Sequence, residues 1–458
     1  MTLLEAMRFP NYLNSNIAVK IRARIKGIDQ IIELTVSEII YAAELAGLNQ
    51  LYISDTGRGK SQLLKDISHH HYGGTAKNGN ANLAMGRADF EIEDLLVRTQ
   101  VDLSSGKYDS KDVRKIDLNR AHRAFFGADE LNRAPRPRQN DFMDLATGER
   151  NFVGENIDLG VDGYSLFIAC VNLNKNNGDF SGTFDMDRAL LNRLAITIDL
   201  DHERYRPTPD DEIDMEERAA NPKVKTPPPQ DLTEQILEAN KKIITDTVQL
   251  KPYLTAFRFL IGRGLDYCDK SKYKTKGPTF PILCTECNYS GKPICTRIKG
   301  SSERTISAVS RMSRAISYIS KLKTGEQDLH IDPFDAALEA FRFTTYHGNL
   351  NELIILDEHE AQPQYMMDET ITQLKAPINI LRNYLPHILD GHEPTILSYN
   401  NPDGTPVKAQ KTPKLIETLN ECGINYQELS LKDQLKECGI GTDWVDPYVR
   451  RMKKRAKQ

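Results

Sequence analysis

Short apolar runs alternate with longer amphipathic stretches over the N-terminal part of the chain. Three of these runs, each bounded by polar turn residues, have the length and composition of buried strands: 51–53, 124–128 and 166–171. Between them, segments such as 139–147 place apolar residues at helical spacing. Because strand and helix alternate, the pattern predicts an α/β fold built on a parallel sheet with helices on both faces.

Other elements precede or interrupt this alternation. Residues 27–48 carry apolar side chains near helical spacing and end at Gly47, which predicts a helix leading into the first strand. Around 101–116 and 151–164, turn signals separate short β-prone pieces. These two segments are therefore predicted to be β-hairpins inserted into the core.

The distribution of proline and charge divides the chain further. Residues 206–231 are rich in proline and acidic residues, and they are predicted to be an exposed linker after a core domain of residues 1–205. Residues 232–345 are helical in pattern, with a cysteine-rich insertion at 266–298. The remaining residues, 346–458, mix helical segments with loops and are predicted to form an accessory region.

Two features stand out in the accessory region. The segments 415–424 and 431–440 resemble each other, each an amphipathic pattern closed by a glycine, and together they predict a helical hairpin. The chain ends in a run with six basic residues between positions 450 and 457, which predicts a solvated, disordered tail or a surface for phosphate backbones.

Composition excludes several classes of protein. Of the 458 residues, 39% are hydrophobic and 27% charged, and the net charge is −4, as in a soluble globular protein of two or three domains. No apolar run approaches the roughly 18 residues that a membrane helix needs. Glu5 and Arg8 interrupt what would be the apolar stretch of a signal peptide, so we expect a cytoplasmic protein without a membrane partner.

The first predicted strand runs into a loop with the sequence S-D-T-G-R-G-K-S. This resembles the phosphate-binding pattern G-x-x-x-x-G-K-[ST], in which backbone N–H groups cradle the phosphates, the lysine reaches their outer oxygens and the hydroxyl meets Mg²⁺. A serine replaces the first glycine, and the aspartate after it is expected to face solvent. The predicted nucleotide-binding residues are Ser54, Asp55, Thr56, Gly57, Arg58, Gly59, Lys60, Ser61 and Gln62.

A second chemical signal follows the second predicted strand, where the apolar run ends in Asp129 and Glu130. Acids at the carboxyl end of a parallel strand can bind a metal and orient a water. We expect Asp129, with Ser61, to hold Mg²⁺ and Glu130 to activate the attacking water. An exposed strand end would be the simpler interpretation of the acids alone, but the upstream Lys60 favours ATP hydrolysis.

Longer strings in the sequence resemble the AAA+ ATPases, and within them the MoxR-like group. ADELNRAPRPRQNDFMDLATGER resembles the group's Walker B segment and the helix after it. LFIACVNLN resembles its sensor 1 strand, MDRALLNRL a segment ending in an arginine, and GSSERTISAVSRMSRA its sensor 2 segment. The resemblance covers residues 25–345 and assigns catalytic roles to Asn172, Arg193 and Arg304, beside Glu130.

The resemblance implies a Mg·ATP-dependent ATPase that works as a ring, expected to be a hexamer, and remodels a protein complex. Arg193 would act on the ATP of the neighbouring subunit, and Arg304 would reach its own nucleotide from a helical lid at 232–345. Leu173 stands where the group has a proline after the sensor asparagine, and the insertion at 266–298 is a further departure.

The cysteines and histidines are candidate metal ligands. Four thiols within a short, lysine-rich stretch predict a structural Zn²⁺ site, with reduced cysteines in a loop as the alternative: Cys268, Cys284, Cys287 and Cys295. The odd total of seven cysteines argues against a disulfide framework. The run His69–His71 is predicted to be a solvated helix end, and Cys422 and Cys438 to pack as small apolar residues.

Two further functions stay open. The hairpins, the cysteine cluster and the basic tail fit a nucleic-acid translocase, helicase or loader, although a protein client is the favoured partner. Ser54 and Asp55 fit a scaffold that binds ATP and barely hydrolyses it.

Overall fold

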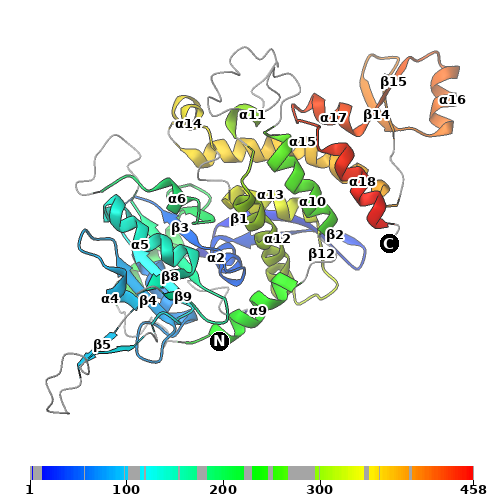
Figure 1. The fold of residues 1–458 in the computed structure, drawn as a ribbon. Helices are drawn as coiled ribbons and strands as arrows, with labels where there is room; N and C mark the ends of the chain where they lie inside the picture. Colours follow the sequence, from blue (N-terminus) through cyan, green and yellow to red (C-terminus); the bar gives the residue numbers. More distant parts are fainter. Residues whose placement is uncertain are drawn as a thin grey trace. The chain divides into compact units, whose positions relative to one another are not determined.

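The computed structural model describes Leu3 and residues 13–456, apart from 56, 97, 102–113, 118–119, 153–154, 173–182, 221–229, 246–250, 267–293, 299, 345–349, 361 and 391–394. The chain divides into two compact units (Figure 1). The first comprises residues 1–247 with 307–348, and the second residues 248–306 with 349–458.

The first unit is an α/β domain with additional antiparallel strands. Its elements, in chain order, are β1 (Ile17–Ile25), β2 (Ile28–Thr35), α2 (Val36–Leu45), β3 (Gln50–Ile53), α3 (Lys60–His71), β4 (Ala81–Met85), α4 (Ile92–Leu96), β5 (Arg98–Val101), β6 (Arg114–Asp117), β7 (Phe125–Asp129), η3 (Leu131–Arg133), α5 (Arg136–Thr147), β8 (Glu149–Phe152), β9 (Glu155–Asp158), β10 (Leu166–Val171), α6 (Arg188–Leu191), β11 (Ile196–Asp199), α7 (Pro209–Ala220), α9 (Thr233–Thr245), β12 (His330–Ile331) and α13 (Pro333–Thr344). Helix α12 (Glu303–Thr324) begins in the second unit and continues in the first.

The core of the first unit is a five-stranded sheet in the order β11-β3-β10-β7-β4. All four pairings are parallel, so the carboxyl ends of the strands meet at one edge. The three strands predicted from apolar runs are β3, β7 and β10, at the centre of this sheet. The predicted α/β class with a parallel-sheet core is confirmed.

Helices cover both faces of the sheet, which explains why its strands are continuously apolar. On one face Phe126, Phe167 and Ala169 pack in a buried cluster with Phe142 of α5 and Leu190 of α6. On the other face, α3 contacts β4, β7 and β10. A Cβ atom on Gly127 would lie 3.0 Å from Leu64 of α3, so this glycine allows α3 to approach the sheet closely.

The helix predicted at residues 27–48 is wrong in its first half. Ile28–Thr35 forms β2, which pairs with β1 in an antiparallel hairpin closed by Lys26 and Gly27, both at positive φ. Ile32 and Leu34 are buried while Ile31 is exposed, a period of two. The helix begins only at Val36, where a capping box between Thr35 and Glu38 starts α2.

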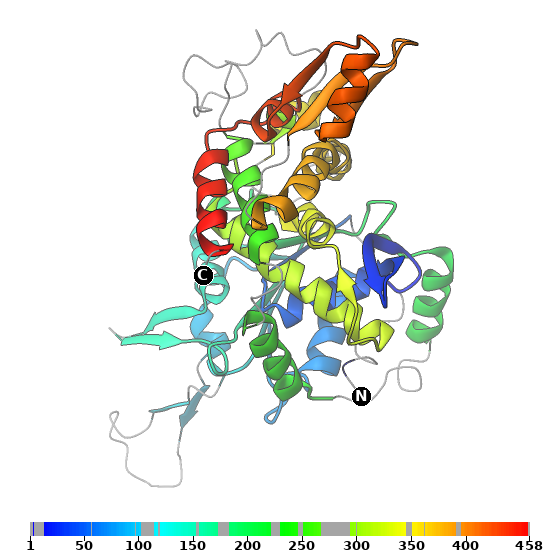
Figure 2. The same ribbon diagram turned by 90° about the vertical axis from the view of Figure 1, so that its right-hand side faces the viewer.

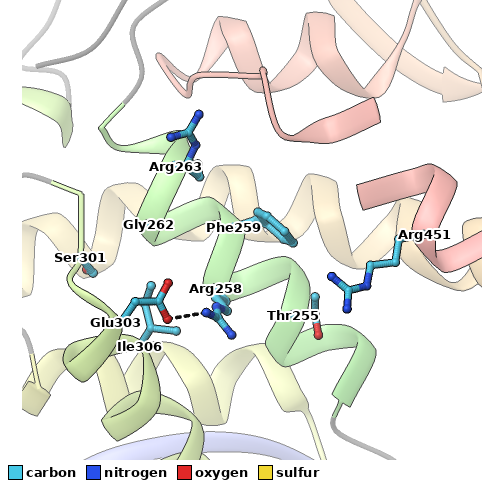
Figure 3. A pocket seen from close by; sticks show the side chains of 9 residues that line it. All are labelled: Thr255, Arg258, Phe259, Gly262, Arg263, Ser301, Glu303, Ile306 and Arg451. Atoms are coloured by element: carbon cyan, nitrogen blue, oxygen red, sulfur yellow. Dashed lines mark hydrogen bonds and ion pairs between the residues drawn. The ribbon is translucent and has the colours of Figure 1, made fainter. Parts of the chain in front are cut away.

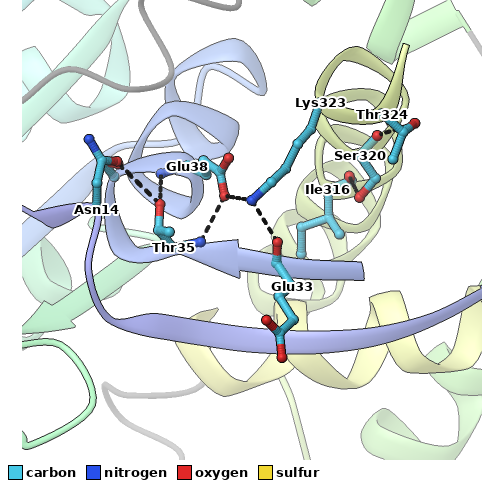
Figure 4. A network of polar contacts seen from close by, with 9 residues as sticks. Asn14, Glu33, Thr35, Glu38, Ile316, Ser320, Lys323 and Thr324 are labelled. Carbon is cyan, nitrogen blue, oxygen red and sulfur yellow. Dashed lines mark hydrogen bonds and ion pairs between the residues drawn. The ribbon is translucent and has the colours of Figure 1, made fainter. Parts of the chain in front are cut away.

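This capping box also anchors the distal part of α12 (Figure 4). The Lys323 ammonium lies 2.8 Å from the Glu38 carboxylate and donates to the Glu33 carbonyl at 2.8 Å. The same carboxylate oxygen of Glu38 accepts from the Thr35 N–H at 2.8 Å. One half-buried lysine therefore joins the hairpin, the start of α2 and α12.

Two hairpins extend from the core, as predicted. β5 pairs with β6 and β8 pairs with β9, both antiparallel. The β5–β6 pair projects beyond the rest of the first unit in both ribbon views (Figures 1 and 2). These hairpins follow α4 and α5 directly, so the core helices fix their bases.

The second unit is mainly helical and carries a small sheet. Its other elements are α10 (Lys251–Phe259), the π-helical turn η4 (Leu260–Gly264), α11 (Ile294–Arg297), α14 (Glu352–Glu358), α15 (Pro363–Leu389), β13 (Ile396–Asn400), β14 (Pro406–Gln410), α16 (Pro413–Glu421), β15 (Tyr426–Leu429), α17 (Leu431–Glu437) and α18 (Val445–Ala456). The sheet order is β14-β13-β15, all antiparallel. The long α15 contacts α10, α11, α17 and α18.

Three predictions for the C-terminal region are wrong. The echoing segments form α16 and α17, but β15 lies between them, so they do not form a helical hairpin. Cys422 is exposed and therefore not packed in a core. The basic run is not a disordered tail up to Ala456, because it forms the end of α18, which buries Tyr448, Val449 and Met452.

Within the described part of the chain, no helix has the length and apolar character needed to cross a membrane. The predicted domain boundaries stay a prediction. Part of the predicted linker, Pro209–Ala220, is the helix α7 of the first unit.

Candidate nucleotide-binding site

The predicted phosphate loop connects the buried strand β3 to helix α3. Gly57 and Gly59 both have φ of +80°, a conformation that favours glycine. Ser54 is fully buried and is not among the described residues with positive φ, which explains how a serine can stand where the pattern has its first glycine. Asp55 is exposed, as predicted. Thr56 lies outside the described residues.

Lys60 is the first residue of α3, and only 7% of it is exposed. Its ammonium group donates three hydrogen bonds back to the loop, to the Ser54 carbonyl at 2.9 Å, the Ser54 hydroxyl at 2.6 Å and the Asp55 carbonyl at 2.8 Å. Burial lowers the pKa of Lys60, while the carboxylates of Asp201, Asp129 and Asp55 act in the opposite direction. The loop thus holds a buried cation whose present acceptors are neutral oxygens.

The two acids lie where β7 ends, one strand beyond β10 from the loop. Glu130 has a φ of 51°, and its N–H donates to the Asp129 carboxylate at 3.0 Å. The Glu130 carboxylate pairs with Arg133 at 3.0 Å. Left-handed backbone at a non-glycine residue is strained and is often found at functional sites. The Asp129 carboxylate therefore faces the Glu130 N–H, while the Glu130 carboxylate pairs with Arg133.

Asn172 follows the central strand β10 and is buried. Its backbone is held from β7's side of the sheet by Asn132, whose amide donates to the Asn172 carbonyl at 2.5 Å and accepts from its N–H at 3.4 Å. Sequence reasoning missed Asn132. The sequence contained one indication of it, because Asn132 is an uncharged polar residue between the acids Asp129 and Glu130 and the basic Arg133.

The two predicted arginines lie in different units. Arg193 follows α6 and donates to the Thr147 hydroxyl at 3.1 Å and to the Ala189 carbonyl at 2.9 Å. Arg304 is exposed in the first turn of α12, in the second unit.

The last two residues of the predicted nucleotide-binding set lie on α3, where Ser61 is half-buried and Gln62 is exposed. The functional roles of all these residues stay predictions.

Helix α7 packs against the loop, which sequence reasoning did not predict. A Cβ atom on Gly59 would lie 2.9 Å from the Met215 side chain, and Arg58 lies 3.7 Å from Glu212. Further along, Arg218 of α7 makes a bidentate ion pair with the buried Asp66 of α3, at 2.5 and 2.6 Å. The acidic residues of the predicted linker thus belong to a helix that lies beside the loop and is tied to α3.

The donor set of this edge fits a Mg·nucleotide. Mg²⁺ prefers oxygen ligands, and the Ser61 hydroxyl and Asp129 carboxylate supply them. The loop supplies a buried ammonium and two glycines at positive φ, the chemistry that triphosphates need. Gly59 has a φ of +80°, at which any other side chain would be strained, so the shape of the loop depends on this glycine.

The zinc hypothesis falls mostly outside the described residues. Cys268, Cys284 and Cys287 lie there, and Cys295 is on α11. In the described part of the chain, no group of three or more His, Cys, Asp or Glu residues is placed to hold a metal. The zinc site stays a prediction.

The histidine run at the end of α3 is not solvated as predicted. His70 and His71 are buried, and His71 lies 2.9 Å from the buried Glu44 of α2. Burial is the main cause that lowers the pKa of His70 to about 4. The run therefore belongs to the core between α2 and α3.

Comparison with known proteins gives structural similarity only. No protein-family model matches the chain, and no curated protein matches its sequence significantly. Among solved structures, a candidate ATPase from Cytophaga hutchinsonii is similar with a TM-score of 0.49 and 17% identity, covering 72% of this chain and 86% of that one. A full-length MCM homolog from Methanopyrus kandleri is similar with a TM-score of 0.39 and 13% identity, covering 68% of this chain and 55% of that one. Both TM-scores are low, so the fold assignment depends on the strand order and loop geometry of this chain.

Proposed function

We propose that this chain is an AAA+ ATPase of the MoxR-like group, which hydrolyses Mg·ATP in a ring and thereby remodels a protein complex. The observation that supports this most is the arrangement at the carboxyl edge of the sheet. The loop with Lys60 follows β3, the acids Asp129 and Glu130 end β7, and Asn172 follows β10, which lies between these two strands.

Each of these residues has a task in phosphoryl transfer. Lys60 would exchange its loop acceptors for phosphate oxygens, and a charged acceptor would strengthen that bond. Glu130 would leave Arg133 and take a proton from the attacking water, while Asn172 would orient that water. Ser61 and Asp129 would hold Mg²⁺, which neutralises charge on the phosphates when bound.

The ring follows from Arg193, which the resemblance assigns to the neighbouring subunit's nucleotide. An arginine brought to the γ-phosphate in trans supplies a large part of the rate. Within its own chain, Arg193 donates to the Thr147 hydroxyl and to the Ala189 carbonyl. Arg304 would act on its own subunit's nucleotide, and the ring would be a hexamer.

ATP hydrolysis by purified wild-type protein and by Glu130→Gln tests the proposal. We expect the variant to bind ATP and to hydrolyse it at least about 100-fold more slowly, because it lacks the base. Glu149→Gln, at an exposed residue of β8, is the matched control and should keep the wild-type rate. Tight ATP binding without hydrolysis by the wild type would instead support the scaffold function.

Mixed assemblies test the ring. Arg193→Ala subunits retain the loop, and Lys60→Ala subunits retain the arginine, so a mixture should recover hydrolysis that neither variant shows alone. If no mixing ratio restores activity, Arg193 does not act in trans.

A nucleic-acid motor or loader is the second candidate function. The exposed basic residues of α18 favour it, since the run that carries them is an ordered helix up to Ala456. Stimulation of ATP hydrolysis by DNA or RNA, with steep salt dependence, would support this function over protein remodelling.

A further inference from the structure

The second unit contains a pocket that the proposed ATPase chemistry does not use (Figure 3). Its volume is about 450 Å³, within the range of small-ligand sites. Three elements of this unit line it: α10 with η4, the start of α12, and α18. The lining residues are Thr255, Arg258, Phe259, Gly262, Arg263, Ser301, Glu303, Ile306 and Arg451.

The charged lining is predominantly basic. Arg258 forms an ion pair with Glu303, and Arg263 forms one with Asp443 at 2.6 Å. Arg451 is exposed on α18 and has no ion-pair partner among the residues that the structure describes. In Figure 3, Arg451 extends from α18 toward α10, and Thr255 lies between it and Arg258 in this view. The pocket therefore carries an excess of guanidinium groups.

One buried hydroxyl of the lining also lacks a partner. Ser301 is 8% exposed, and its hydroxyl has no hydrogen-bond partner among the described residues. Buried hydroxyls are normally hydrogen-bonded, so an unpaired one lining a pocket points to a ligand or water. The next residues begin α12, where the Ser302 hydroxyl accepts from the Thr305 N–H at 3.2 Å, and the N–H groups of Glu303 and Arg304 precede the first acceptor within the helix. This end of the helix favours anions.

The pocket is built on a rigid base. The ring of Trp444 stacks on Phe259 with centroids 5.9 Å apart and an angle of 4° between the planes. Tyr448 of α18 donates to the Pro252 carbonyl of α10 at 3.0 Å. These contacts hold α18 against α10, so Arg451 is presented from a fixed helix. They also place an aromatic ring in the pocket wall.

We propose that this pocket binds a phosphate group of single-stranded nucleic acid. Guanidinium groups suit phosphate because they can donate two parallel hydrogen bonds. Phe259 offers a ring beside which a base can lie. The exposed residues Arg450 and Lys454 of α18 extend the positive charge beyond the pocket. This favours a nucleic-acid strand as the ligand over a free nucleotide.

The inference is independent of the proposed ATPase function, and it can be tested without ATP. The full-length protein is titrated into a fluorescein-labelled oligo(dT) strand, and binding is followed by fluorescence anisotropy at several KCl concentrations. Arg451→Glu should weaken binding about tenfold or more and reduce the salt dependence, because one phosphate contact is lost and a like charge is introduced.

Two further variants give the test its controls. Lys414→Glu changes the net charge equally on exposed α16, and it should alter affinity by less than about twofold. Glu303→Gln removes the carboxylate that competes for Arg258, and it should tighten binding about two- to threefold. A mutation that merely damages the fold would not produce this opposite sign.

Several outcomes would overturn the inference. Equal effects of Arg451→Glu and Lys414→Glu would show that charge alone, and not this pocket, attracts the strand. Displacement of the strand by equimolar thymidine monophosphate would identify a free-nucleotide site instead. Competition by polyglutamate as effective as that by unlabelled oligo(dT) would point to an acidic protein partner. Unchanged unfolding midpoints of the variants are required for each comparison.

Discussion

Two arginine–carboxylate pairs, one in each unit, differ in burial, and this difference determines how much each pair contributes to stability. In the first unit, Arg218 and Asp66 have side chains 15% and 3% exposed. In the second, Arg258 and Glu303 have side chains 50% and 78% exposed. Removing one partner of a buried pair leaves an uncompensated charge, whereas an exposed pair exchanges readily with water and ligands.

The polar groups of the two regions also differ in whether they are buried and paired. Lys60, at the start of the helix that carries Asp66, is also buried and has three acceptors. Near Arg258, Arg451 is exposed and Ser301 has an unpaired hydroxyl. The first arrangement is organised before any ligand binds, and the second depends on a ligand to pair its polar groups. Substitutions in the first should therefore change catalysis and stability most.

Lys60→Ala should have the largest effect. It removes the cation that would contact the phosphates, so ATP hydrolysis should fall by about 100-fold or more. Steady-state ATPase assays measure this. Lys65→Ala, at an exposed position of the same helix, is the control and should retain wild-type turnover. Equal rates for the two variants would remove Lys60 from the catalytic machinery.

Arg218→Met should give the largest loss of stability. Asp66 would stay buried between α3 and α7 without its bidentate partner, which costs about 3 kcal/mol. Urea denaturation measures the change in the free energy of unfolding. The double variant with Asp66→Asn should recover most of the loss, since no unpaired charge remains. A double variant as unstable as Arg218→Met alone would mean that packing, and not charge, is responsible.

These buried contacts show what the sequence could not predict. The apolar runs of β3, β7 and β10 were recognisable because strands buried on both faces consist almost wholly of apolar residues. The interactions of α7 were not, since Arg218 meets a partner 152 positions away and most of the helix surface is charged. Local sequence patterns indicate which residues are buried. They do not indicate which residues far apart in the sequence form an ion pair.

The same limit explains the misassigned segments. Residues 28–35 contain enough isoleucine and leucine to satisfy either a helical or a strand period, and pairing with β1 decided between them. In the candidate site, the loop and both acids were predictable from motif spacing. Asn132 was not, because its role depends on β7 and β10 lying side by side.

His70 should make the first unit sensitive to acid. Burial holds its pKa at about 4 in the folded protein, below the ordinary 6.5, with His69, His71 and Arg218 lowering it and Asp66 raising it. Since the unfolded chain binds the proton first, this contribution to stability is complete above pH 6.5 and is lost as the pH falls toward 4.

Between pH 7 and 5, that loss should amount to about 1–2 kcal/mol in the free energy of unfolding. Urea denaturation across this range measures it, and His70→Gln should have a flatter pH profile than the wild type. The half-buried His69→Gln serves as control. An identical slope in His70→Gln and wild type would mean that another group causes the acid sensitivity.

Glu303→Gln should have the smallest effect on stability, and it completes the comparison of the two pairs. Because Arg258 remains half exposed and can be solvated, the free energy of unfolding should change by less than about 0.5 kcal/mol. Urea denaturation, in the same buffer as for Arg218→Met, measures it. Raising the KCl concentration should reduce even this difference, since salt screens exposed charges. If Glu303→Gln lowered the free energy of unfolding as much as Arg218→Met, the two pairs would contribute equally to stability. The proposed difference between a buried, structural pair and an exposed pair in a ligand pocket would then be wrong.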